Sequence, residues 1–209
     1  MNILGHTYVA LAVGNASPEH LLGAVLPDLA PMARVRVRRS DLGGDLAEGV
    51  RCHHLTDAAF HAHVDFRAGS KALRLGLAGR DVGQGPARAI GHAGWELLLD
   101  GILVGSAVEQ AFHRAMEVGE GALGAMSPED ASRWTAFLDR ARRSPRLAYD
   151  DPAWVADRLH MMLARRPRLR QPHAQVGTVA EELARHAPSV AASGPMVLCD
   201  TAGAVGASA

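Results

Sequence analysis

Helix-forming segments dominate this chain, and they constrain its fold more than any other feature. Residues 47–77 carry apolar side chains at helical spacing, with Gly69 and Gly76 as helix-weakening residues in the later part of the segment. Alternating β-branched or aromatic runs, which are typical of strands, are limited to the short segment MARVRVRRS. The sequence therefore predicts an all-α fold, a single helical bundle of roughly seven helices.

Three helix starts share one pattern, in which a capping side chain is followed by proline. Ser17-Pro18, Ser127-Pro128 and Asp151-Pro152 each place Ser or Asp directly before a proline at the first helical position. We predict one helical domain over residues 1–187. From Pro188 onward the residues are small and weakly apolar, so we expect residues 188–209 to form a disordered tail.

Charge and hydropathy exclude several classes of protein. The formal net charge is zero, so no overall field attracts nucleic acid, and we expect no nucleic-acid partner. The most apolar window, residues 89–108, contains three ionisable residues, which are costly in a membrane-spanning helix. The N-terminus has no basic residue before its apolar part and makes a poor signal peptide. We therefore expect a cytoplasmic protein without a membrane span.

Histidines are concentrated in the stretch RCHHLTDAAFHAH, residues 51–63, which holds four of the eleven in the chain. On a helix, residues four apart lie on one face, so His53, Asp57 and His61 form a line of side chains. His54 and His63 point elsewhere, and we expect them to support that line or face solvent. This line predicts a set of imidazole and carboxylate groups on one helix face.

A second helix repeats this spacing with His92, Glu96 and Asp100, among apolar neighbours. Buried carboxylates without partners cost several kcal/mol, on the order given for ions in proteins, so a cation should lie against them. His6, in an apolar N-terminal segment, and Asp28, where a helix end after Pro27 would turn it inward, complete the set. The predicted metal ligands are His6, Asp28, His53, Asp57, His61, His92, Glu96 and Asp100.

Mixed imidazole and carboxylate ligands suit a divalent metal, either one ion or two. Manganese is the preferred expectation, with iron or zinc as alternatives. The same residues are also compatible with a purely structural network, in which buried ion pairs form with nearby arginines. The residue pattern leaves both interpretations open.

Five segments resemble, in the same order, the acyl carrier protein phosphodiesterase family. They are MNILGHTYVALA, LLGAVLPDL, GVRCHHLTDAAFH, ELLLDGIL and MMLARRPRL, and the similarity covers roughly residues 1–172. The resemblance implies an all-α fold related to the HD-domain metal phosphohydrolases. It also implies release of 4′-phosphopantetheine from acyl carrier protein with a divalent metal such as manganese. Residues 1–187 would then be a helical metal-binding hydrolase domain.

Five residues fall on matching motif positions of the family: His6, Asp28, His53, Asp57 and Asp100. Glu96 falls where the family has another acidic residue. The chain departs from the family in having no His-Asp dipeptide, and Phe60-His61 replaces the family's Thr-Asp. His61 and His92 would supply imidazoles lost elsewhere, so the metal ligands, and the substrate with them, can differ from those of the family.

The predicted reaction is metal-dependent hydrolysis of a phosphodiester, either on acyl carrier protein or on another substrate. A bound metal would activate water and hold a phosphoryl oxygen, while Asp28 or Asp57 orients or deprotonates that water. Of the 22 Lys and Arg residues, all but Lys71 are arginine, and arginine favours phosphate and carboxylate. Two arginine groups can stabilise phosphate, dock an acidic partner or simply face solvent. They are Arg34, Arg36, Arg38 and Arg39, and Arg165, Arg166, Arg168 and Arg170.

Two other classes of protein fit the same residues. His and carboxylate ligands in helical folds also serve iron-dependent oxygenases. A non-catalytic helical binding module would use the groups as a structural network. A serine or cysteine hydrolase is disfavoured, because Cys52 and His53 are adjacent in sequence and their side chains diverge on a helix.

Overall fold

The computed structural model describes residues 1–119, 123, 126–143 and 147–208, without the side chain of Arg39. The described residues form helices and no strand, which confirms the all-α prediction; they contain nine α-helices where roughly seven were expected. The α-helices are α1 (Ile3–Ala12), α2 (Pro18–Ala33), α3 (Gly44–Ala62), α4 (Val64–Ala78), α5 (Gln84–Gly101), α6 (Ala107–Glu117), α8 (Pro128–Arg143), α9 (Pro152–Leu163) and α10 (Val176–Gly206). Two short 3-10 helices, η1 (Arg39–Asp41) and η2 (His173–Gln175), precede α3 and α10.

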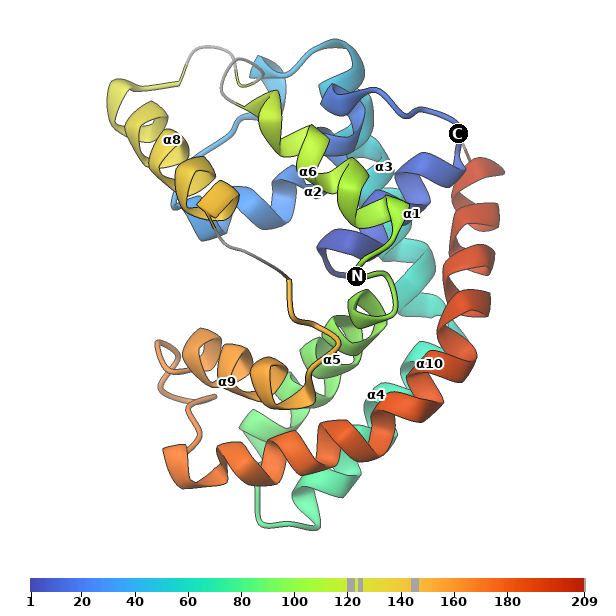
Figure 1. Ribbon diagram of the computed structural model, residues 1–209, viewed down its shortest axis with the longest axis vertical. Coiled ribbons are helices and arrows are strands. Elements are labelled where there is room, and N and C mark those ends of the chain that lie inside the picture. Colours follow the sequence, from blue (N-terminus) through green and yellow to red (C-terminus); the bar gives the residue numbers. More distant parts are fainter. Residues whose placement is uncertain (120–122, 124–125, 144–146, 209) are drawn as a thin grey trace.

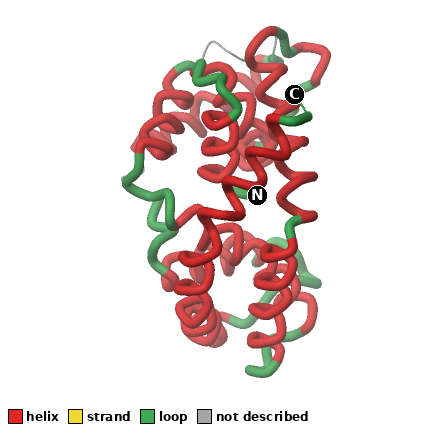
Figure 2. Tube along the Cα trace, turned by 90° about the vertical axis from the view of Figure 1, so that its right-hand side faces the viewer, coloured by secondary structure: helices red, strands yellow, loops and turns green. Residues whose placement is uncertain are grey.

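The long helix α10 connects two groups of helices. It contacts α9, α4 and α5 over its first part and α3 and α1 further on. Figure 1 shows α10 curving along one side of the molecule, with α4, α5 and α9 near its start and α1 near its end. The side view in Figure 2 shows helices throughout, joined by short loops. Helix α10, whose second half was expected to be disordered, therefore packs against both groups.

The predicted helix starts are confirmed by their caps. The Ser17 hydroxyl accepts a hydrogen bond from the backbone N–H of His20 at 3.2 Å, and Asp151 accepts one from Ala153 at 2.9 Å. Ser127 accepts in the same way from Asp130 at 3.2 Å. Each side-chain oxygen satisfies a backbone N–H that has no partner within its helix, which stabilises the start of that helix.

The helical stretch predicted over residues 47–77 is divided at His63. This residue has φ −62° and ψ 132°, ends α3 and begins α4. Its ring nitrogen Nδ1 accepts a hydrogen bond from the backbone N–H of Asp65 at 3.2 Å, as an N-cap side chain does. Sequence periodicity missed the break because apolar spacing continues across it, and histidine is not a residue that ends helices by itself.

Helices α2 and α3 cross at Gly23 and Gly49. A Cβ atom added at Gly49 would lie 2.1 Å from the carbonyl oxygen of His20, and one at Gly23 would lie 2.2 Å from that of Leu46. The backbones therefore approach more closely than any side chain would allow. This crossing matters for the site, because α2 carries Asp28 and α3 carries His53 and Asp57.

Gly49→Ala is expected to lower the free energy of unfolding by at least about 3 kcal/mol, the upper part of the range for overpacking, because the clash is with backbone that cannot rotate away. For a chain of this length the melting temperature should fall by on the order of 10 °C. Gly203→Ala in α10 is the matched control: no atom lies within 4 Å of its added Cβ. It should leave stability unchanged or slightly higher. Equal melting temperatures for the two variants would contradict the close crossing.

The expected disordered tail over residues 188–209 is wrong where the structure describes it. Helix α10 continues to Gly206, through Pro188 and Pro195. The buried residues in this part are Val190, Gly194, Val197, Leu198, Thr201 and Val205. Their separations of three and four form an apolar stripe along one helix face. The stripe is easily overlooked because, apart from Leu198, it consists of valine, glycine and threonine rather than large apolar residues.

None of the helices in the described part of the chain combines the length and the apolar character needed to cross a membrane.

Candidate metal centre

Helices α1, α2 and α3 bring four of the predicted ligands together: His6, Asp28, His53 and Asp57, which we call the buried group. His6 Nε2 lies 3.3 Å from Asp57 Oδ1 and 3.8 Å from Asp28 Oδ2, and His53 Nε2 lies 3.5 Å from Asp57 Oδ2. Ligand atoms of His6, Asp28 and His53 all lie within 4.8 Å of one another. Nitrogen and oxygen atoms thus converge from three helices, as they do in metal sites of helical bundles.

The two imidazoles of the buried group are neutral and held in place. Burial lowers the pKa of His6, and it lowers the pKa of His53 to about 3. The rings stack with their centroids 3.9 Å apart. His53 Nδ1 lies 2.9 Å from the backbone carbonyl oxygen of Ala24, to which it can donate, leaving Nε2 free to accept. This arrangement, with one ring nitrogen tied to the backbone, is typical of a metal-binding histidine.

Several buried polar atoms of this group have no hydrogen-bond partner. They are both ring nitrogens of His6 and the Oδ2 atom of Asp28. Burial also raises the pKa of Asp28 to about 7, against the opposing effect of the Met1 ammonium. Buried polar groups without partners are costly, and a bound cation is one way to satisfy both an imidazole nitrogen and a carboxylate oxygen.

His61, Glu96 and His92 form a second set, which we call the open group. The Nε2 atoms of His61 and His92 each lie 3.1 Å from the same oxygen, Glu96 Oε1. His61 belongs to α3, and His92 and Glu96 belong to α5. The side chain of His61 is 37% exposed, that of His92 is 50% exposed and that of Glu96 is 13% exposed. The three ligand atoms lie within 4.8 Å of one another. The sequence prediction of one large set is thus resolved into two smaller ones.

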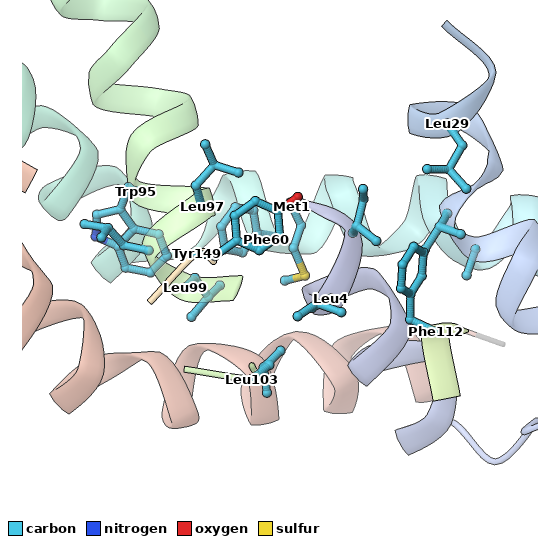
Figure 3. Packing of buried hydrophobic residues seen from close by; sticks show 14 of the residues in the cluster. Met1, Leu4, Leu29, Phe60, Trp95, Leu97, Leu99, Leu103, Phe112 and Tyr149 are labelled. Atoms are coloured by element: carbon cyan, nitrogen blue, oxygen red, sulfur yellow. The ribbon is translucent and has the colours of Figure 1, made fainter. Parts of the chain in front are cut away.

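The N-terminal ammonium of Met1 lies between the two groups. Its nitrogen is 2.8 Å from Asp57 Oδ1 and 3.2 Å from Glu96 Oε1, and it is fully shielded from solvent. Burial alone would lower the pKa of this ammonium. The negative charges of Glu96 and Asp57 outweigh the effect of burial, so the pKa is raised. The Met1 side chain packs in the hydrophobic cluster with Leu4 and Phe60 (Figure 3). The ammonium group is therefore a cation that lies against both Asp57 and Glu96.

The ammonium and the imidazoles keep two carboxylates ionised. Burial opposes ionisation of Asp57, but the His6 ring 3.3 Å away and the Met1 ammonium outweigh burial, so the pKa of Asp57 is lowered. Burial likewise opposes ionisation of Glu96, and hydrogen bonds from His61 and His92 with the ammonium again lower its pKa. Both carboxylates are therefore available as anionic ligands.

Asp100 has a different place from the one predicted for it. Its Oδ2 accepts hydrogen bonds from the Asn2 side chain at 2.7 Å and from the Leu4 N–H at 2.8 Å, and its Oδ1 accepts from the Gly5 N–H at 2.8 Å. It is fully buried, and burial raises its pKa to about 7. Asp100 thus satisfies the free N–H groups at the start of α1 and positions that helix, rather than joining either metal-ligand group.

A broad basic groove of about 1590 Å³ lies beside the open group, with His92 among its lining residues. None of the described residues that line it is acidic. Its walls come from α4, α5, α8 and α9 together with the end of α2, and Figure 1 shows α8 and α9 on the same side of the molecule. The basic lining residues are Arg67, Lys71, Arg74, Arg88, Arg140, Arg158, Arg165 and Arg166.

The two predicted arginine groups differ in their relation to this groove. Arg165 and Arg166 line it, whereas Arg168 and Arg170 are exposed in the same loop without being among its lining residues. In the other group, the exposed residues Arg34, Arg36 and Arg38 follow α2 and do not line the groove. The side chain of Arg39 lies outside the described part of the structure.

Sequence reasoning missed the other six basic residues of the groove. Arg67, Lys71 and Arg74 are separated by four and three residues, so they share one face of α4, and this spacing was a usable indication. Arg88, Arg140 and Arg158 come from three further helices, and no local pattern connects them. The ammonium of Met1 was missed for a similar reason, because its partners are more than fifty residues away.

No protein-family model matches the chain, and comparisons with curated proteins and with solved structures found no match. The resemblance to acyl carrier protein phosphodiesterases and the HD-domain likeness therefore remain predictions from the five sequence segments.

Proposed function

We propose that this protein is a metal-dependent phosphohydrolase, most specifically a phosphodiesterase, with its metal held by the buried group. The observation that carries the proposal is the pair of buried, stacked imidazoles of His6 and His53. Their Nε2 atoms face the carboxylates of Asp57 and Asp28, while His53 is tied to a backbone carbonyl. Manganese is the preferred ion, and iron or zinc would fit the same donors.

A divalent ion held there supplies a water of lowered pKa and a Lewis acid for a phosphoryl oxygen. Asp57 stays ionised and is shared between His6 and His53, so it fixes the geometry of the two imidazoles. The side chains of Asp28 and Asp57 are 36% and 34% exposed, so water can reach both; Asp28, which is not shared between the two imidazoles, is the candidate to accept a proton. The remaining arginines would bind the phosphate or the body of the substrate.

The basic groove supports a substrate with an acidic surface. Eight basic side chains line it, and His92 connects it to the metal-ligand groups. Acyl carrier protein, the partner that the sequence resemblance suggests, belongs to this class of acidic substrate. In that case the reaction would release 4′-phosphopantetheine; another phosphodiester remains the alternative substrate.

Apo protein is expected to be inactive, and added Mn²⁺ should restore cleavage of bis(p-nitrophenyl) phosphate, because no side chain in the site is a credible nucleophile by itself. Holo acyl carrier protein should be the better substrate if contacts in the groove add binding energy, and its cleavage should weaken with salt. Release of nitrophenol and of phosphopantetheine would be followed separately. Activity on the small ester alone would point to a different natural substrate.

His53→Ala serves as the inactive control in this assay and His113→Ala as the active one, since His113 is an exposed histidine outside both groups. Absence of cleavage of both substrates with Mn²⁺, Fe²⁺, Mg²⁺ and Zn²⁺ would exclude the phosphodiesterase proposal.

An iron-dependent oxygenase is the second candidate, and the open group favours it. Two histidines and one carboxylate with solvent-exposed faces are the ligand type of non-haem iron oxygenases. Iron in the purified protein together with oxygen-dependent turnover would support this alternative. A non-catalytic network is favoured by the Met1 ammonium, which already neutralises part of the carboxylate charge. Metal-free protein whose melting temperature does not respond to added metal would support that interpretation.

A further inference from the structure

We infer that the open group, His61, His92 and Glu96, binds a metal ion of its own, distinct from the ion proposed for the buried group and facing the basic groove. The inference extends the proposed function and depends on it for the reaction, although the metal site itself rests on separate residues. It places the ion of the open group on the side of the metal centre that faces the substrate groove.

The distances within the open group suit direct coordination. Glu96 Oε1 lies 3.1 Å from His61 Nε2 and 3.1 Å from His92 Nε2. Donor atoms that bind one ion at about 2.1 Å are about 3.0–3.4 Å apart in octahedral or tetrahedral geometry. Both imidazole nitrogens face the same carboxylate oxygen, and the three ligand atoms lie within 4.8 Å of one another. The Met1 nitrogen lies beside them, 3.5 Å from His61 Nε2. The three side chains can therefore serve as donors to one ion.

Aromatic packing holds the two imidazoles in this orientation. The buried ring of Phe66 meets His92 edge-on, with centroids 5.2 Å apart, and lies 5.4 Å from the ring of His61. The ring of Phe60 packs against Phe66 at 4.3 Å and also lies 5.4 Å from the ring of His61. Because α3, α4 and α5 each contribute to this packing, the donor atoms are fixed by the core and not by mobile surface side chains.

The imidazoles of the two groups differ in exposure. His6 and His53 are almost completely buried, whereas the His92 side chain is 50% exposed and lines the groove. An ion with three protein donors on the exposed side keeps free coordination positions for water or for an oxygen of the substrate. The open group has one carboxylate and the buried group has two, so the open group should also bind its ion more weakly.

The two groups are linked through the Met1 nitrogen, which contacts Glu96 Oε1 and Asp57 Oδ1. An ion in the open group would therefore share Glu96 with the ammonium or displace it. Two ions placed in this way can hold different oxygens of one phosphate, a recognised arrangement in phosphate-ester hydrolysis. The ion of the open group would thus bind a phosphate oxygen of a substrate that lies in the basic groove.

The test is metal stoichiometry in protein purified without an affinity tag, stripped of metal and titrated with Mn²⁺, with elemental analysis and electron paramagnetic resonance as readouts. Wild-type protein should bind two ions, the second at least tenfold more weakly, and the spectrum of the doubly loaded protein should show magnetic coupling. His92→Ala and His61→Ala should each bind one ion and lose the coupling. His53→Ala should lose the tighter ion.

His113→Ala is the matched control, because the exposed His113 lies 3.8 Å from the buried Glu109 four residues away, and the described residues place no third ligand beside them. It should retain both ions. Circular dichroism would confirm that His92→Ala is folded, as expected for a half-exposed side chain. A stoichiometry of one in wild-type protein, unchanged in His92→Ala, would overturn the inference and leave the proposed function intact. A stoichiometry of zero would overturn both.

Discussion

A chain that ends at Ser189 is expected to lose its cooperative thermal unfolding transition. The deletion removes four buried apolar side chains of α10, Val190, Val197, Leu198 and Val205, each at most 2% exposed. Burial of one such side chain contributes about 1.5–3 kcal/mol, so the four together contribute roughly 6–12 kcal/mol. That sum is comparable with the whole free energy of unfolding of a typical domain, about 5–15 kcal/mol.

Circular dichroism during heating is the measurement for this truncation. A chain that ends at Gly206 is the control, because it retains every buried residue of the helix and should melt like the full chain. If the chain ending at Ser189 melts within about 2 °C of the full chain, the packing of this helix against α1 and α3 contributes nothing to stability.

Asp57→Asn is expected to lower bound metal at least tenfold and to abolish metal-dependent hydrolysis. Asp57 faces His6 with one oxygen and His53 with the other, so the substitution removes a negative charge at the centre of the buried group while keeping its shape. Substitution of a residue that merely supports a metal ligand lowers metal affinity or activity about 10–100-fold. Substitution of a direct ligand should lower metal affinity at least as much. Elemental analysis after reconstitution with Mn²⁺ is the measurement.

Asp157→Asn, at an exposed carboxylate on α9, is the control and should retain full occupancy and activity. The melting temperature of the metal-free Asp57 variant separates a metal site from a structural network. A network would lose stability without any change in metal content, since the negative charge 2.8 Å from the Met1 ammonium is lost. Full metal occupancy in Asp57→Asn would remove this residue from the ligand set.

The all-α fold could be predicted because its evidence is local. Ser17, Ser127 and Asp151 mark helix starts within one or two residues, and caps act over that range. The break at His63 and the length of α10 could not be predicted in this way. The break depends on how α3 and α4 pack, and α10 passes through two prolines because its valines are buried by other helices.

The ligand residues could be predicted in part, for a similar reason. The four-residue spacings of His53 with Asp57 and of His92 with Glu96 are visible in the sequence and are present in the structure. Which of them meet across helices is not a local property. Asp100 has the same spacing from Glu96, yet it caps α1, because helix α5 carries it past the open group to the start of α1.

This cap has a consequence for the order in which the chain becomes organised. The hydrogen bonds from Leu4 and Gly5 to Asp100 join residues more than ninety positions apart, and His6 follows them directly in α1. Closing so long a loop is entropically costly, so such contacts form after local helices during folding. The unfolded chain therefore has no preformed set of donors, and any cation that prefers the assembled set raises the free energy of unfolding with its concentration.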